Sequence, residues 1–110
     1  MKVIVDLCII PIGVGTSLSK YISICEEKIK KAELKYILCP NGTSIEGDWD
    51  KVFEVIKECH QSLHDMKIPR IHTSIKLGTR TDKNQSLEDK ISSIIKPENI
   101  SWYEYSSFFS

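Results

Sequence analysis

The 110-residue sequence predicts an α+β fold, in which two long helices pack on a four-stranded antiparallel sheet. Two long stretches carry apolar residues at helical spacing, and four shorter stretches have the composition of strands. These stretches follow one another in the order strand, helix, strand, strand, helix, strand. A chain of this length is expected to form a single domain, with a core large enough to fold without disulfides or a metal.

The first predicted strand covers residues 2–10, where valine and isoleucine lie on both faces. A strand that is apolar on both faces is usually central in its sheet. Asp6 interrupts the second face, so its carboxylate needs a partner or a wet cavity. Gly13 and Gly15 then form a bent connector, because this segment lacks both the Lys-Ser/Thr of a P-loop and the third glycine of a dinucleotide-binding motif.

The first helix is expected over about residues 17–32, where one apolar stripe recurs at steps of three and four. Its members are Leu18, Ile22, Cys25, Ile29 and Ala32. Residues 35–39 form a short strand, and residues 40–42 (Pro-Asn-Gly) predict a hairpin turn. The return strand is expected over residues 43–46, and residues 47–48 are expected to end it.

The second helix is expected over about residues 49–66, with Asp48 placed to cap its first turn. Its stripe consists of Val52, Val55, Ile56, Cys59, Leu63 and Met66. Residues 70–78 form the last strand. A capping-box-like segment beginning at Ser86 opens a short third helix. We therefore expect residues 1–96 to form one domain, and residues 97–110 to form an aromatic-rich C-terminal tail without a clear period.

This order of elements is the split βαβ pattern of a ferredoxin-like sandwich. Right-handed crossovers place both long helices on one face of the sheet and leave the other face uncovered. Since a bare sheet face of mixed composition in a small domain is usually buried by another copy of the protein, we expect a homo-oligomer.

Composition excludes several classes of function. Lysine plus arginine equals aspartate plus glutamate, 15 each, so no basic field exists to hold a nucleic acid. The apolar N-terminal run is too short and too interrupted for a signal peptide or a spanning helix, so we expect no membrane association and a cytoplasmic protein. The 4 cysteines form no C-x-x-C pair and are expected to be free thiols.

The hairpin region holds the first candidates for binding or catalysis. Thr43 and Glu46 lie on the predicted return strand. Glu46 is either an exposed strand residue paired with a lysine or an acceptor for a cationic or amino-bearing ligand. Asp6 is the other carboxylate within a strand. Two carboxylates suit acid–base work, but nothing in the sequence fixes their separation.

The histidines offer weaker signals. His60 and His64 have the i, i+4 spacing of many zinc pairs, but position 61 is glutamine, so the metalloprotease motif is absent and no metal is expected. His72, in the last strand, is expected to satisfy a hydroxyl or backbone partner at an interface rather than to catalyse.

A polar loop follows the last strand and contains Arg80, Asp82 and Lys83. It is either a charged turn, an anion site in which Arg80 binds bidentately, or an intersubunit salt bridge. No order of serine, histidine and aspartate, or of cysteine and histidine, can be assigned to a nucleophilic site. We therefore expect neither a catalytic residue nor a cofactor.

Five short motifs occur together in this chain: Pro11-x-Gly13, Thr43-x-x-Glu46-Gly47-Asp48, His60, Arg70-x-His72-Thr73, and Arg80-Thr81-Asp82-Lys83. In this combination the sequence resembles the small thiamine-binding-protein family, which is related to the YkoF-like hydroxymethylpyrimidine-binding proteins. The resemblance covers roughly residues 2–96. The C-terminal tail departs from the short ends of that family.

The resemblance implies a ferredoxin-like fold, a dimer-of-dimers assembly, and binding of thiamine or its pyrimidine portion without catalysis. It places Thr43 and Glu46 against the ligand, and Glu46 or Asp6 opposite the thiazolium charge. His72, Thr73, Arg80 and Asp82 match the late motif, whose role is either ligand contact or interface.

Three functions follow as hypotheses. The first is a non-enzymatic oligomer that binds thiamine or its hydroxymethylpyrimidine precursor. The second is a structural or regulatory module, in which the same residues form the subunit interface. The third is an enzyme with Glu46 or His72 as acid–base groups, for which the sequence suggests no substrate.

Overall fold

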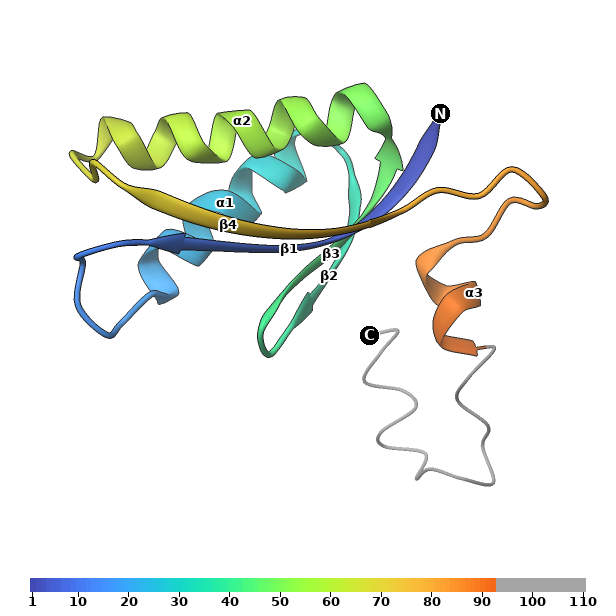
Figure 1. The fold of residues 1–110 in the computed structure, drawn as a ribbon, viewed down its shortest axis with the longest axis horizontal. Coiled ribbons are helices and arrows are strands. Elements are labelled where there is room, and N and C mark those ends of the chain that lie inside the picture. The colour runs from blue at the N-terminus through green and yellow to red at the C-terminus, as the bar shows by residue number, and fades with distance from the viewer. Residues whose placement is uncertain (93–110) are drawn as a thin grey trace. The chain divides into compact units, whose positions relative to one another are not determined.

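The computed structural model describes residues 1–92, which fall into two units, Met1–Thr79 and the chain from Arg80 onward. The first unit contains, in chain order, β1 (Lys2–Pro11), α1 (Ser19–Lys31), β2 (Lys35–Cys39), β3 (Gly42–Asp48), α2 (Trp49–Asp65) and β4 (Ile71–Gly78) (Figure 1). The second unit contains α3 (Leu87–Ser92). The predicted tail lies outside the described residues.

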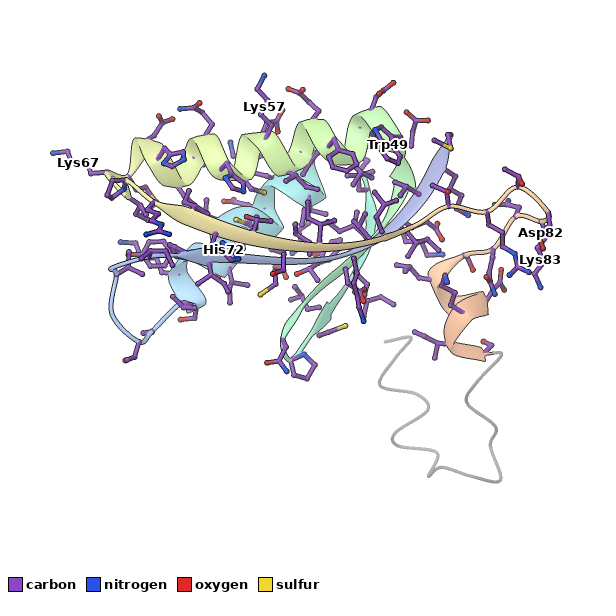
Figure 2. The ribbon with its side chains drawn as sticks, in the orientation of Figure 1. Trp49, Lys57, Lys67, His72, Asp82 and Lys83 are labelled. Carbon is purple, nitrogen blue, oxygen red and sulfur yellow. The ribbon has the colours of Figure 1, made fainter. Side chains whose placement is uncertain are left out.

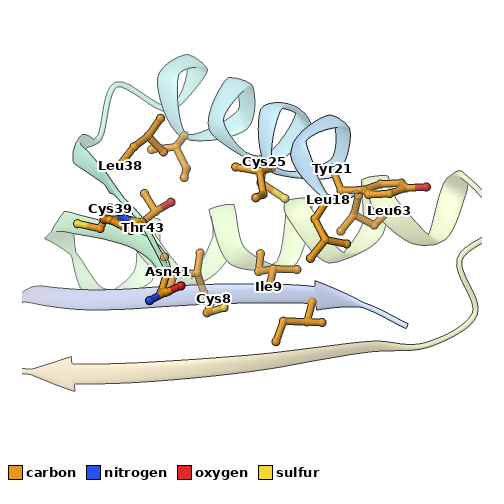
Figure 3. Close-up of a pocket in the computed structure, with 16 residues that line it drawn as sticks. Cys8, Ile9, Leu18, Tyr21, Cys25, Leu38, Cys39, Asn41, Thr43 and Leu63 are labelled. Carbon is orange, nitrogen blue, oxygen red and sulfur yellow. The ribbon is translucent and has the colours of Figure 1, made fainter. Parts of the chain in front are cut away.

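The sheet of the first unit has 4 strands in the order β2-β3-β1-β4, and every neighbouring pair is antiparallel. Both long helices lie on the same side of β1 and β4 (Figure 3). The predicted ferredoxin-like α+β sandwich is therefore confirmed.

The core lies between this sheet and the two helices. Val3, Val5 and Leu7 alternate along β1 and are buried on its helix-facing side, as the two-residue period of a strand requires. They pack with buried residues of the other elements, namely Ile29, Ile45, Val52, Val55, Cys59 and Leu63. Lys57 projects from α2 away from the sheet (Figure 2), so α2 is amphipathic.

The hairpin differs from its prediction. The loop consists of Pro40 and Asn41 alone, because Gly42 already pairs with Cys39 at the start of β3. Gly47 does not end β3 but pairs with Val3 inside the sheet. A Cβ at Gly47 would stand 2.5 Å from the side chain of Leu34. The glycine therefore leaves room for the Leu34 side chain to pack against β3, and the expectation that it ends the strand was wrong.

The helix starts differ in their capping. The Asp48 side chain accepts a hydrogen bond from the Asp50 amide at 3.3 Å, which confirms the predicted cap of α2. Helix α1 begins at Ser19, two residues later than predicted, and its N-cap residue Leu18 gives no side-chain bond. In the second unit, Ser86 and Asp89 bond each other's backbone amides at 3.1 and 3.0 Å, which confirms the capping box of α3.

Candidate functional site

A cavity of about 390 Å³ lies between α1, β1 and the hairpin that joins β2 to β3 (Figure 3). We call it the apolar cavity. Aliphatic and aromatic side chains form most of its wall, including Leu7, Ile9, Leu18, Tyr21, Ile22 and Leu63. Its volume falls near the lower end of the range for small-molecule pockets, roughly 300–1,000 Å³.

The polar groups of the apolar cavity come from the hairpin. Thr43 lies on the helix-facing side of β3, opposite Leu7 of β1 and Leu38 of β2. Asn41, at the turn, contributes a side-chain amide. Among residues 1–92, no hydrogen-bond partner is found for the Thr43 hydroxyl. The site can thus hold a flat, mostly apolar ring and offer it a few hydrogen bonds at one end.

A second depression, of about 330 Å³, lies on the opposite side of the same hairpin. We call it the hairpin hollow. It shares residues 39–43 with the apolar cavity and adds Asp6 and Ser44 from the uncovered face of the sheet. The Ser44 hydroxyl donates to the Asp6 carboxylate at 2.6 Å. Asp6 therefore has the hydroxyl partner that its place in an apolar strand requires, and its charge faces the hollow.

Thr43 and Glu46, grouped by sequence as ligand contacts, lie on opposite faces of β3. They are three positions apart in the strand, so the two-residue period turns their side chains away from each other. Glu46 forms an ion pair with Lys2 at 3.6 Å and is 13% exposed. It lines neither the apolar cavity nor the hairpin hollow. The simpler of its two predicted roles, pairing with a lysine, is therefore present.

Thr73 and His72 are likewise separated by the sheet. His72 is exposed on the uncovered face, opposite Ile10 of β1. Thr73 lies beneath α2, where its hydroxyl is 2.6 Å from Nε2 of His60. This pairing was not predicted, because His60 was considered as an exposed helix residue or a metal ligand. Its place beside the apolar stripe of α2 was the signal that it faces the sheet.

The predicted polar loop belongs to the second unit. Arg80 binds both carboxylate oxygens of Asp82, at 2.5 and 2.8 Å, and donates to Gln85 at 3.0 Å. This contact lowers the pKa of Asp82 to about 2. The guanidinium is thus engaged within its own loop, as in the charged-turn alternative. Lys83 is exposed in the same loop.

The described residues contain no group of three or more histidine, cysteine, aspartate or glutamate side chains that could hold a metal ion. No helix within residues 1–92 is long and apolar enough to cross a membrane.

Comparison with known proteins identifies the family. The family model of thiamine-binding proteins matches residues 5–95. The chain belongs to the thiamine-binding protein family. A UPF0045 protein of Synechocystis is 46% identical over 94 residues, which cover 86% of this chain and 78% of that one. The resemblance inferred from the motifs is therefore confirmed.

Two solved structures share the fold. A hypothetical protein of Methanocaldococcus jannaschii superposes with a TM-score of 0.79 at 36% identity, over 84% of this chain and 95% of that one. A candidate thiamine biosynthesis or salvage protein of Thermotoga maritima superposes with a TM-score of 0.73 at 24% identity, over 84% and 98% of the two chains. The second likeness carries the fold alone.

Proposed function

We propose that this protein binds thiamine or its hydroxymethylpyrimidine precursor without catalysing a reaction, and that the pyrimidine ring occupies the apolar cavity. The observation that carries the proposal is the Thr43 hydroxyl, which stands at the wall of an apolar cavity of about 390 Å³ in a member of the thiamine-binding family. A substituted pyrimidine is flat, so it suits apolar walls. Its amino group and ring nitrogens suit the polar groups of the hairpin.

The hairpin hollow suits the charged part of thiamine. The thiazolium ring is cationic, whereas the free pyrimidine precursor is neutral. Asp6 is the carboxylate that lines this hollow, and it lies across the hairpin from the apolar cavity. We assign Asp6 the role of balancing the thiazolium charge. Glu46 is the alternative carboxylate, but it would first have to leave Lys2.

Calorimetric titration with both ligands tests this assignment. Thr43→Val removes the hydroxyl and preserves the shape of the side chain. It should lower the affinity for both ligands about 5–10-fold, as the loss of one hydrogen bond does. Asp6→Asn should lower the affinity for thiamine several-fold and leave the affinity for the neutral pyrimidine unchanged. Glu46→Gln is the matched carboxylate control and should change neither affinity.

Three results would contradict parts of the proposal separately. Absence of heat with both ligands at millimolar concentration would remove the binding function. Equal losses for thiamine and the pyrimidine in Asp6→Asn would remove the charge assignment only. A selective loss of thiamine in Glu46→Gln would transfer that role to Glu46.

We also propose that the protein is cytoplasmic and forms a homo-oligomer through the uncovered face of the sheet. Ile4, Ile10 and Ile37 are partly buried there although neither long helix covers this face. The competing hypothesis is that the protein is a structural or regulatory module, whose only function is to associate with other copies through this face. Ile10→Lys should then change the mass measured by sedimentation while ligand heats remain absent in the unmodified protein.

A further inference from the structure

Two cysteines meet where α1 packs on α2. Cys59 of α2 is fully buried, and its thiol donates to the backbone carbonyl of Cys25 at a sulfur–oxygen distance of 3.8 Å. Each residue belongs to the apolar stripe of its own helix, so helix packing brings together positions that are 34 residues apart in sequence. Both are free thiols.

The two thiols differ in their access to small molecules. Cys25 lines the apolar cavity, whereas Cys59 does not. Figure 3 shows Cys25 projecting from α1 towards the space above β1. A small reagent inside the cavity therefore meets Cys25 first, and Cys59 lies behind it in the core.

The two thiols also differ in acidity. Hydrogen bonding with Cys59 lowers the pKa of Cys25, against the opposing effect of burial. The same contact and burial raise the pKa of Cys59, which therefore keeps its proton. Cysteines that are oxidised reversibly combine thiolate character with access and stand next to a resolving cysteine. Cys25 is itself only 8% exposed, but it borders the apolar cavity, its pKa is lowered, and Cys59 stands beside it as the resolving cysteine.

We propose that Cys25 and Cys59 are a peroxide-oxidised pair, in which Cys25 reacts first and Cys59 resolves it to a disulfide that joins α1 to α2. The Cys25 thiolate attacks one oxygen of hydrogen peroxide, the O–O bond breaks, and hydroxide leaves to become water. Cys25 is then a sulfenic acid. The Cys59 sulfur attacks the Cys25 sulfur, the S–O bond breaks, and the hydroxyl leaves as water with the Cys59 proton. Two thiols are oxidised and one peroxide is reduced to two waters.

The disulfide changes the wall of the apolar cavity and the stability of the fold. It removes the Cys25 thiol from the lining and cross-links the two long helices. Closing a loop of this length should raise the melting temperature on the order of 10 °C in the oxidised form. These consequences do not depend on what the cavity binds.

Peptide mapping of the full chain tests the proposal directly. Trypsin places the 4 cysteines in separate peptides, with Cys25 in residues 21–28 and Cys59 in residues 58–67. The protein is treated with one equivalent of hydrogen peroxide, its remaining thiols are alkylated, and it is then digested. The expected product is the 21–28 and 58–67 pair joined by a disulfide and lost on reduction, together with the higher melting temperature before reduction.

Variants separate the two roles. In Cys59→Ala the disulfide should be absent and Cys25 should stop at the sulfenic acid, which dimedone traps. Cys39→Ala is the control, because Cys39 also lines the cavity and is exposed, and the Cys25–Cys59 bridge should form there at an unchanged rate. A bridge between Cys8 and Cys39, a link between two chains, or an unreacted Cys25 in the folded unmodified protein would overturn the proposal.

Discussion

Nε2 of His60 on α2 lies 2.6 Å from the hydroxyl of Thr73 on β4. This contact joins the second helix to the edge strand of the sheet at a partly buried position. His64, one turn further along α2, donates from Nδ1 to the Ile68 carbonyl at 2.7 Å. The centroids of the two imidazole rings are 6.3 Å apart. Both histidines thus hold the end of α2 in place.

Protonation of His60 makes the stability of the fold depend on pH. Burial, and secondarily the charge of His64, lower the pKa of His60 below its ordinary value of 6.5. The unfolded chain therefore binds a proton more readily than the folded chain does. The contribution of His60 is fully present above pH 6.5, and it is lost as the pH falls from there towards the lower, folded-state pKa.

Melting curves recorded between pH 5 and pH 8 measure this dependence. His60→Gln should flatten the change in melting temperature across pH 6.5, because glutamine does not titrate. His72→Gln, at an exposed position near the start of β4, is the matched histidine-to-glutamine control. An equal flattening in both variants would show that the effect does not belong to His60.

Removing the partner hydroxyl tests the same contact at constant pH. Thr73→Val keeps the shape of the side chain but leaves His60 without its acceptor or donor. The free energy of unfolding, measured by urea denaturation at pH 8, should fall by about 1 kcal/mol, the usual value of one hydrogen bond. Thr73→Ser retains the hydroxyl and should lose less. If serine costs as much as valine, the methyl group rather than the bond stabilises this position.

The sequence predicted the faces of the strands, but it did not predict the apolar cavity beside them. Parity along a strand decides which residues face the helices, so the buried positions of β1 followed directly from alternation. The same rule places Thr43 and Glu46 on opposite faces of β3, and it could have been applied to them from the sequence. By contrast, the apolar cavity depends on how closely α1 approaches the hairpin, and no local pattern encodes that distance.

The role of Gly47 likewise depends on tertiary packing that no local pattern encodes. Gly47 resembles a strand breaker in sequence, because its role comes from Leu34, which packs where a Cβ would stand. The Cys25–Cys59 contact depends in the same way on the crossing of two helices. Such features need the tertiary arrangement, whereas caps such as Asp48 and Ser86 are local and were correctly predicted.

The second unit yields a prediction that requires only its own residues. Arg80 lowers the pKa of Asp82 to about 2, chiefly through their side-chain hydrogen bonds. Carboxyl carbon chemical shifts followed by NMR over pH 1.5–6 should show this low midpoint. In Arg80→Ala the midpoint should rise towards the ordinary aspartate value of about 3.9. Lys83→Ala removes a weaker, purely coulombic influence and should move the midpoint less. Equal shifts in the two variants would mean that net charge, not the bidentate contact, sets the pKa.

Gly42 connects the stability of the hairpin to both depressions. A Cβ at this position would stand 2.9 Å from the Leu7 carbonyl oxygen, which belongs to the backbone of the central strand and cannot rotate away. Gly42→Ala should therefore push the hairpin away from β1 and lower the free energy of unfolding by about 1–3 kcal/mol. Gly78→Ala is the matched control in β4, since nothing in the described chain lies within 4 Å of its added Cβ. It should change stability by no more than about 0.5 kcal/mol.

Gly42 lines both the apolar cavity and the hairpin hollow. Gly42→Ala should therefore also weaken the binding of thiamine, as measured by calorimetry. An affinity that survives the loss of stability would place the ligand away from this hairpin.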